Sequence, residues 1–300
     1  MINKRKEGCA PAVRPLFFQG QMNSYSKQAG AIGIFDSGYG GLTVFDKIHA
    51  LMPQYDYIYL GDNARAPYGP RSFEVVYRFT RQAVMKLFEQ GCQLVILACN
   101  TASAKALRSI QQRDLPEWDP TRRVLGVIRP TVELMDKLSH TKHVGIVGTT
   151  GTISSGSYQI ELAKMFPHIR VTAEACPMWV PLVENNEADS PGADYFVKRH
   201  LEHLFAQDSQ IDTLILGCTH YPLLLNTIRR YVPKGVTLLP QGEYVAQSLS
   251  DYLHRHPEMD AKLTQQGTCR FLTTESADKF SDTASLFLNR PIHVEQVTID

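Results

Sequence analysis

Short apolar runs alternate with segments of helical periodicity along most of the chain. In residues 72–90, for example, apolar side chains recur at positions 76, 79, 83 and 87, which is the spacing of one face of a helix. The apolar runs predict buried strands at residues 31–35, 55–60, 94–98, 124–128, 143–147, 171–175, 214–217, 236–239 and 269–274. We expect the last of these at a sheet edge. Strands that alternate with helices are typical of an α/β fold with mainly parallel sheets.

The order of elements in the first part of the chain recurs in the second. In the first part of the chain, a predicted strand leads into a polar loop at Asp36, and a later strand ends at Cys99. In the second part, a predicted strand leads into a polar loop at Gly148, and a later strand ends at Cys218. This weak internal repeat favours two similar, pseudo-symmetric α/β domains. Because ligands bind at the carboxyl ends of parallel strands, we expect the active site in the cleft between the two domains.

The boundaries of these domains follow from where the repeat restarts. We expect residues 31–122 and 236–300 to form the first domain and residues 123–235 to form the second. Residues 1–30 show no periodicity, and we expect a disordered extension there. Residues 115–121 contain Pro and Trp, which favour a hinge or a long loop.

Two cysteines lie between a buried run and a helix-compatible segment. Cys99 follows one apolar run, and Cys218 follows another, with Pro222 placed where a first helical turn tolerates proline. At a helix N-terminus, free N–H groups and the helix dipole lower the pKa of a thiol, so we expect a lowered pKa for both. One such cysteine is more often structural. Two in the same setting favour a pair that works together.

Composition excludes several classes of protein. A formal charge of +1 on 300 residues gives no electrostatic argument for binding nucleic acid or a membrane surface. No apolar run approaches the roughly 20 residues that span a bilayer, and the basic start lacks the apolar segment of a secretory signal. The six cysteines contain no CxxC pair and no zinc-like spacing. We therefore expect a cytoplasmic protein with reduced thiols and no metal site.

Three other segments carry polar groups at the ends of predicted elements. The Gly-rich loop after Asp36 and Ser37 lacks the full dinucleotide-binding spacing and a phosphate-binding lysine, which argues against a nucleotide. Residues 61–70 form a loop dense in turn residues, in the position where α/β sheets bind ligands. Glu184 ends an apolar patch, where it could be either a surface residue that caps the next helix or a functional carboxylate.

Two thiols that face each other across a cleft are compatible with several chemistries. A disulfide exchanger is disfavoured without CxxC, and Cys218 with His220 alone makes a poor metal site. A cysteine acyltransferase stays possible, but it leaves the second thiol without a role. Acid–base catalysis uses both thiols, since one removes a proton and the other donates one to the opposite face of the carbon. Inversion of a stereocentre in both directions requires this arrangement.

Four blocks along the chain carry a family resemblance. They are residues 33–44, Pro-Tyr-Gly at 67–69, Ala-Cys-Asn-Thr-Ala at 98–102 and Gly-Cys-Thr-His-Tyr-Pro-Leu at 217–223. In this order they resemble the signature blocks of the glutamate racemases, and the likeness runs from about residue 31 to the C-terminus. The resemblance implies a cofactor-independent isomerase that converts L-glutamate to D-glutamate for peptidoglycan synthesis, with neither a pyridoxal group nor a metal.

The resemblance also implies a role for each residue of the site. Cys99 and Cys218 would be the two acid/base residues, and Asp36 would assist Cys99. Glu184 and His220 would assist Cys218. Glutamate would be bound by polar side chains and backbone groups that suit a carboxylate. The residues implied for binding are Asp36, Ser37, Pro67, Tyr68, Gly69, Asn100, Thr101, Thr149, Thr152, Thr219 and His220.

One segment departs from the family pattern. Arg129 stands where many members have glutamate, and Thr131 replaces the usual glycine. Because the blocks expected to touch the substrate are intact, we interpret Arg129, Pro130 and Thr131 as a change at a domain or subunit surface. This change leaves open the geometry of the homodimer that the resemblance implies.

Two other functions stay open at this point. An aspartate or hydantoin racemase would use the same fold and thiols and differ only in the loops that contact the side chain. A non-catalytic protein that binds an amino acid is the alternative from a different class. Binding alone needs neither thiol, so the pair favours an enzyme.

Overall fold

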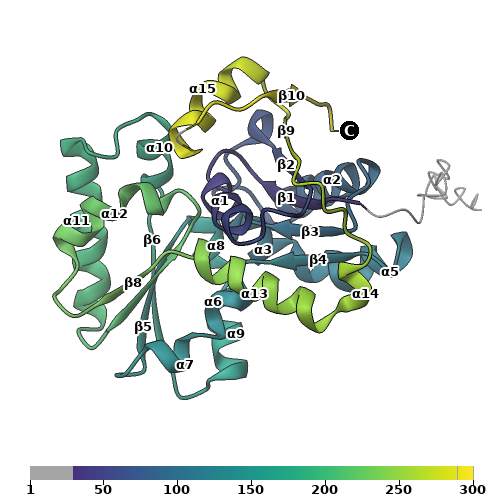
Figure 1. The fold of residues 1–300 in the computed structure, drawn as a ribbon. Helices are drawn as coiled ribbons and strands as arrows, with labels where there is room; N and C mark the ends of the chain where they lie inside the picture. Colours follow the sequence, from purple (N-terminus) through teal and green to yellow (C-terminus); the bar gives the residue numbers. More distant parts are fainter. Residues whose placement is uncertain (1–29, 289, 300) are drawn as a thin grey trace, which may run out of the picture.

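The computed structural model describes residues 30–288 and 290–299, which form two parallel sheets (Figure 1). The six-stranded sheet has the order β10-β9-β2-β1-β3-β4 and the four-stranded sheet the order β6-β5-β7-β8, with parallel pairing throughout. The α/β class expected from the alternating pattern is confirmed. The disordered extension expected at residues 1–30 falls outside the described residues except for Gly30, whose backbone bridges to Leu263.

The strands are short and follow the apolar runs. Those of the six-stranded sheet are β1 (Ile32–Asp36), β2 (Tyr57–Gly61), β3 (Leu94–Leu97), β4 (Arg123–Gly126), β9 (Cys269–Thr273) and β10 (Val294–Gln296). Those of the four-stranded sheet are β5 (His143–Gly148), β6 (Arg170–Ala175), β7 (Thr213–Gly217) and β8 (Thr237–Leu239).

Helices connect the strands and cover both sheets. The longer ones are α1 (Leu42–Leu51), α2 (Phe73–Glu89), α9 (Ser157–Met165), α11 (Pro191–Gln207), α12 (Leu225–Tyr231), α13 (Gly242–Arg255) and α15 (Ala277–Leu288). The shorter ones are α3 (Asn100–Lys105), α4 (Leu107–Ser109), α5 (Leu115–Trp118), α6 (Ile128–Val132), α7 (Met135–Leu138), α8 (Thr150–Ser154), α10 (Trp179–Glu184), α14 (Pro257–Asp260), the 3₁₀ helices η1 (Asn63–Arg65) and η3 (Tyr221–Leu224), and the π-helix η2 (Ile110–Asp114).

Both faces of the six-stranded sheet are buried, which explains why its strands read as continuous apolar runs. Neighbouring residues of β1 enter different cores: Ile34 packs with α1, α13 and α15, whereas Phe35 packs with α2 and α3. Both side chains are fully buried. In the four-stranded sheet, Leu216 packs with α10, α11 and α12, and Ile215 packs with α6 and α9.

The crossings between the two sheets lie later in the chain than the boundaries we expected. β4 pairs with β3, so residues 123–126 belong to the first sheet, and β8 pairs with β7, so residues 237–239 belong to the second. The boundaries at 122/123 and 235/236 therefore each need to move past one strand. Strand pairing is a tertiary contact, and the apolar pattern of a strand does not state which sheet it joins.

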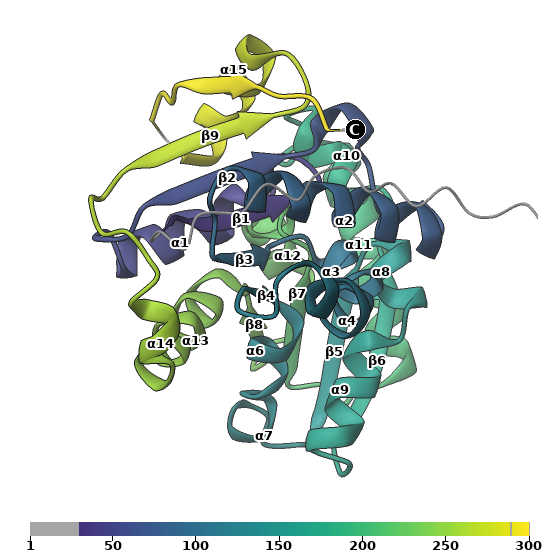
Figure 2. The ribbon, with the colours of Figure 1, turned by 90° about the vertical axis from the view of Figure 1, so that its right-hand side faces the viewer.

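Two local expectations are wrong. Residues 269–273 lie inside the sheet between β2 and β10, because the short strand β10 adds outside them and carries little apolar signal of its own. Residues 115–118 are helical: η2 runs directly into α5, whose first turn accommodates Pro116. Figure 2 shows the yellow C-terminal segment returning to the first sheet, with β9 beside β2.

Among the helices in the described part of the chain, none is long and apolar enough to cross a membrane.

Candidate active site

The carboxyl ends of β1 and β7 are joined by hydrogen bonds across the two sheets. The hydroxyl of Thr219, just after β7, lies 3.5 Å from Oδ1 of Asp36 at the end of β1. Thr43 at the start of α1 donates to the backbone carbonyl of Thr219 at 3.0 Å. A Cβ on Gly40 would come within 2.4 Å of Nδ1 of His220, so glycine is needed for this close approach. The loops after the strands of both sheets therefore meet at one place.

Cys99 is the N-cap of α3 and is 6% exposed. Its Sγ accepts a hydrogen bond from the backbone N–H of Ala102 at 3.5 Å and lies 3.4 Å from Oγ of Ser37. Burial, and then the nearby charge of Asp36, raise the pKa of Cys99 to about 12. The lowered pKa expected from a helix N-terminus is therefore wrong. Two hydrogen bonds from a short helix and a hydroxyl are outweighed by desolvation.

Asp36 is also buried, with 1% of its surface exposed. Its Oδ2 accepts a hydrogen bond from the backbone N–H of Gly38 at 2.9 Å. Burial raises its pKa above the ordinary range of an aspartate, although the charge of His220 acts in the opposite direction. A carboxylate with a raised pKa is a stronger base than an exposed one, which suits a group that receives a proton.

Cys218 has different neighbours from Cys99. Its Sγ lies 3.9 Å from Nδ1 of His220, and Nε2 of the same ring lies 3.0 Å from Oε1 of Glu184. His220 is 4% exposed. Burial lowers the pKa of His220, but the hydrogen bonds with Cys218 and Glu184 outweigh it and raise the pKa to about 10. A protonated imidazole therefore lies between the thiol and a carboxylate near neutral pH.

The backbone around Cys218 only partly matches the expected helix start. β7 ends at Gly217, and the 3₁₀ helix η3 begins at Tyr221 with His220 as its N-cap and Pro222 in its first turn. Pro222 occupies the position expected for it. Cys218 itself precedes the cap, so the free N–H groups of a long helix are not its main partners.

Glu184 is a partner of the site and does not cap the next helix. It ends α10, whose start at Trp179 packs against Tyr221 with ring centroids 4.8 Å apart. The N-cap of α11 is Ser190, whose hydroxyl accepts from the backbone N–H of Ala193 at 3.1 Å. The alternative that Glu184 is a surface residue capping the next helix is therefore wrong.

Three threonine hydroxyls converge where α3 of the first half meets α8 of the second. Oγ1 of Thr101 lies 2.9 Å from that of Thr149 and 3.2 Å from that of Thr152, and Thr149 donates to Thr152 at 3.1 Å. Gly69 lies against them, because a Cβ there would meet Cβ of Thr149 at 3.1 Å. Four of the residues implied for substrate binding are thus brought together from three separate segments.

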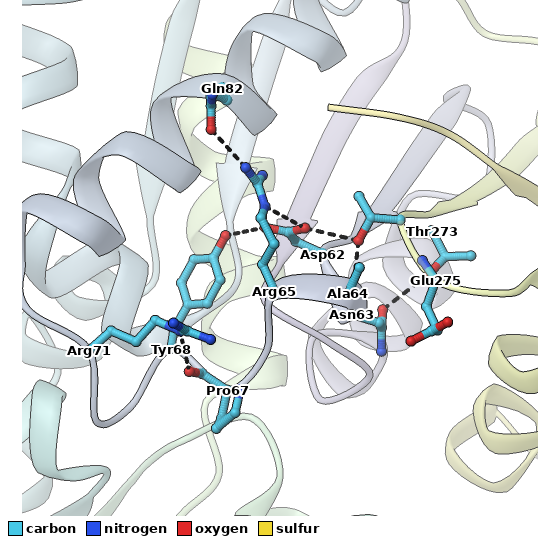
Figure 3. Close-up of polar contacts among 11 residues, drawn as sticks. Asp62, Asn63, Ala64, Arg65, Pro67, Tyr68, Arg71, Gln82, Thr273 and Glu275 are labelled. Atoms are coloured by element: carbon cyan, nitrogen blue, oxygen red, sulfur yellow. Dashed lines mark hydrogen bonds and ion pairs between the residues drawn. The ribbon is translucent and has the colours of Figure 1, made fainter. Parts of the chain in front are cut away.

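Tyr68 has a structural partner for its hydroxyl. Figure 3 shows Tyr68 and Arg65 pointing toward Asp62, which is fully buried and accepts a hydrogen bond from the Tyr68 hydroxyl. Nε of Arg65 donates to both oxygens of Asp62, at 3.0 and 2.7 Å, and Thr274 donates to Oδ1 at 2.9 Å. This buried cluster holds the loop that contains Pro67, Tyr68 and Gly69, and Asp62 carried no signal in the sequence beyond its place in a polar loop.

Asn100 is engaged in a buried network that sequence analysis missed. Its Nδ2 donates to Oε1 of Gln241 at 2.7 Å, and its Oδ1 accepts from the hydroxyl of Tyr158 at 2.6 Å. Gln241 and Tyr158 lie far from Asn100 in the sequence, and neither belongs to a motif. Their contribution to the site becomes visible only in three dimensions.

The residues that depart from the family pattern lie in two different environments. Arg129 is exposed and pairs with Glu133 at 3.0 Å, and both line a cavity of about 800 Å³ that contains neither Cys99 nor Cys218. Thr131 is fully buried, donates to the carbonyl of Val127 at 2.9 Å and accepts from Nε2 of Gln241 at 2.7 Å. Arg129 is thus exposed, whereas the Thr131 hydroxyl completes an interior network where α6 meets the residue before α13.

Within residues 30–288 and 290–299, no cluster of three or more His, Cys, Asp or Glu side chains has the arrangement of a metal site.

Comparison with known proteins gives consistent results for sequence and for structure. The family model for Asp/Glu/Hydantoin racemases matches residues 32–249. A glutamate racemase of Ruegeria sp. (strain TM1040) is 40% identical over 275 residues, which cover 88% of this chain and 99% of the relative. A crystal structure of a glutamate racemase from Bacillus anthracis has a TM-score of 0.82 at 36% identity and covers 90% of this chain and 98% of its own. That of a glutamate racemase from Francisella tularensis in complex with D-glutamate has a TM-score of 0.80 at 32% identity, with 91% and 98% covered.

Proposed function

The chain belongs to the Asp/Glu/Hydantoin racemase family and racemises glutamate, and we propose that Cys99 and Cys218 exchange the proton at its α-carbon. One observation supports this proposal. Cys99 and Cys218 each follow a strand of a different parallel sheet, and the loops after the strands of both sheets meet. Each thiol has a carboxylate within reach: Asp36 is near Cys99, and Glu184 acts on Cys218 through His220. A two-base mechanism needs one acid/base residue on each face of the carbon, and we propose that Cys99 and Cys218 are these two residues.

Before Cys99 can act as a base, its thiol must lose its own proton. Asp36 has a raised pKa and lies close enough for its charge to act on the thiol, so it can receive this proton directly or through water. The Ser37 hydroxyl and the Ala102 N–H then stabilise the thiolate, at 3.4 and 3.5 Å from Sγ. Hydrogen bonds to an ionised group are stronger than those to a neutral thiol, so they favour the reactive form.

On the Cys218 side, the imidazole of His220 carries the proton. Its pKa of about 10 keeps it protonated at neutral pH, where it stabilises a thiolate at Cys218 or returns a proton to it. Glu184 stabilises the imidazolium through the 3.0 Å contact with Nε2. The two thiols therefore reach the same chemistry through different partners.

Removal of the α-proton is energetically difficult, because it is far less acidic than a thiol. General-base catalysis supplies about 10²–10⁴-fold. Positioning of the reacting groups supplies at most about 7–11 kcal/mol more. We propose that the hydroxyls of Thr101, Thr149 and Thr152 and the loop at Gly69 hold the substrate carboxylates, which aligns Cα between the two thiols. The remaining proposed binding groups are Asp36, Ser37, Pro67, Tyr68, Asn100, Thr219 and His220.

The test is circular dichroism of L-glutamate with purified protein and no added cofactor. We expect the signal to decay to zero as the racemic mixture forms, and we expect Cys99→Ala and Cys218→Ala each to abolish the decay. Decay of the circular dichroism signal with L-aspartate but not with L-glutamate would identify aspartate as the substrate and leave the proposed mechanism unchanged. Saturable binding of glutamate without decay would identify a non-catalytic binding protein.

The cellular setting stays a prediction. We propose that the D-glutamate supplies peptidoglycan synthesis in the cytoplasm and that the enzyme is a homodimer. Light scattering of the purified protein would decide the last point, since a monomer mass under assay conditions would contradict the dimer.

A further inference from the structure

Asn100, Gln241 and Tyr158 form a closed ring of hydrogen bonds in the protein interior. Nδ2 of Asn100 donates to Oε1 of Gln241 at 2.7 Å, Nε2 of Gln241 donates to the Tyr158 hydroxyl at 2.7 Å, and that hydroxyl donates to Oδ1 of Asn100 at 2.6 Å. Their exposed fractions are 2%, 4% and 1%. Each donor in the ring is paired with an acceptor on the next residue, so the three hydrogen bonds all run in the same direction around it.

The three residues come from three separate parts of the fold. Asn100 begins α3 in the first half, Tyr158 lies on α9 in the second half, and Gln241 precedes α13 where the chain crosses back from the second sheet to the first. The second N–H of Gln241 reaches Thr131, on α6, where the chain crosses outward. Figure 1 shows α6 and α13 together between the two sheets, and the two helices are in contact.

The ring also touches both thiol turns. Asn100 directly follows Cys99 in the chain. The aromatic side chain of Tyr158 lies against Gly217, the residue before Cys218. A Cβ on Gly217 would be 3.5 Å from Cε2 of Tyr158. The ring of hydrogen bonds therefore ties the turn of Cys99 to the helix that packs beside the turn of Cys218. Tyr158 contacts Asn100 directly, and the amide of Gln241 holds both of them in place.

We propose that Gln241 is a positioning residue for proton transfer, which sets the separation and alignment of the two thiols. This inference rests on the proposed function of Cys99 and Cys218. The two thiols must lie on opposite faces of one carbon, and a misplacement of about 1 Å can cost about 10²-fold in rate. An amide suits this place because it accepts from Asn100 with its oxygen and donates to Tyr158 and Thr131 with its nitrogen.

The test compares Gln241→Met with Thr131→Val. The methionine has a similar size but cannot make the ring, whereas Thr131→Val removes a buried hydrogen bond to the same Gln241 amide and leaves the ring intact. For Q241M we expect kcat to fall about 10-fold or more in both directions, with KM for each enantiomer within about threefold of wild type. The primary isotope effect with α-deuterated glutamate should rise, because proton transfer becomes more rate-limiting. T131V should keep the wild-type kcat and isotope effect.

Three results would overturn the proposal. An unchanged kcat in Q241M would show that the ring does not set the thiols. An equal loss of kcat in T131V would assign the effect to general loss of packing, and a change confined to KM would assign Gln241 to binding. If Q241M does not fold, Tyr158→Phe decides by the same kinetic criteria, since it removes only the hydroxyl that closes the ring. Wild-type protein without racemase activity would instead contradict the proposed function itself.

Discussion

The carboxylate of Glu184 lies 3.0 Å from Nε2 of His220, on the opposite side of the ring from the nitrogen that faces Cys218. Cys99 has a different set of partners, since its Sγ meets the Ser37 hydroxyl and the N–H of Ala102. The two thiols are related by the repeat in the fold, but the groups that control their protons are not. Because the equilibrium between enantiomers is symmetric, any change in kcat/KM must be equal in both directions. The difference between the thiols should therefore appear in pH profiles and isotope effects.

Replacement of Glu184 by Gln should shift the pH profile. Glu184 helps to raise the pKa of His220 to about 10, so the basic limb of kcat/KM, where the imidazolium loses its proton, lies near that value. Removal of the charge lowers this pKa, and the basic limb should move toward neutral pH. Measurement of kcat/KM across pH checks this expectation. Glu187→Gln, an exposed site three residues further on, is the matched control, and an unchanged basic limb in E184Q would contradict the role of Glu184.

Replacement of Asp36 by Asn should impair the Cys99 side. Loss of the proton acceptor should lower kcat/KM by about 10²–10⁴-fold, the range of general-base catalysis. The charge of Asp36 also raises the pKa of Cys99, so the thiol should titrate at lower pH in the variant. Alkylation of Cys99 as a function of pH, in a Cys218→Ala background, measures this shift. Near-native turnover in D36N, or a Cys99 titration that moves upward, would count against the assignment.

Replacement of Thr149 by Val should weaken substrate binding. The Thr149 hydroxyl lies in the cluster with Thr101 and Thr152, which we propose to hold a substrate carboxylate. Hydrogen bonds to charged groups contribute about 1.5–3 kcal/mol, so KM should rise about 10-fold or more. Steady-state kinetics with both enantiomers would show it. A variant with unchanged KM and a lower kcat would instead place Thr149 among the groups that align the reaction.

Replacement of Asp212 by Asn should lower stability in a pH-dependent way. Asp212 accepts hydrogen bonds from Ser139 at 2.7 Å and from the backbone N–H groups of His140 and Thr141 at 2.7 and 2.8 Å. Although burial opposes it, these bonds lower its pKa to about 2. A lowered carboxylate pKa adds stability above the unfolded value of about 3.9, and this stability is lost as pH falls through the folded value.

The free energy of unfolding of Asp212→Asn should accordingly be lower than that of wild type by about 1.5–3 kcal/mol at pH 7. The difference should narrow as pH falls toward about 2. Denaturant unfolding at several pH values measures it. A difference that stays constant with pH would show that the carboxylate charge of Asp212 is not the cause.

Local sequence pattern predicted every described strand except β10, and it placed both thiols directly after strands. Cys99 and Cys218 each follow an apolar run, and parallel strands that are buried on both faces produce such runs. His220 could be proposed as a partner of Cys218 from its position two residues further on, whereas Glu184 needed the family resemblance, because a glutamate there was equally compatible with a capping role. In the structure Ser190 caps that helix.

What the sequence left out depends on contacts between distant residues. Nothing near Gln241 indicates that its amide meets Asn100, 141 residues away, or Tyr158, 83 residues away. The raised pKa of Cys99 follows from burial and from Asp36, and both are properties of the folded chain. The placement of β4 and β8 likewise depends on strand pairing, which no periodicity encodes.

Deuterium incorporation during the first turnovers tests the two-thiol mechanism most directly. L-Glutamate is incubated with the enzyme in D₂O, and the reaction is stopped while conversion is still low. The two enantiomers are then separated, and the deuterium content of each is measured by mass spectrometry. Because one thiol keeps the proton it removes and the other donates a solvent-derived deuteron, we expect D-glutamate to carry one deuterium at Cα while the remaining L-glutamate keeps its protium. The mirror result should hold when the reaction starts from D-glutamate. D-Glutamate that retains the protium of the substrate, or equal early labelling of both enantiomers, would show that a single base serves both faces and would contradict the account.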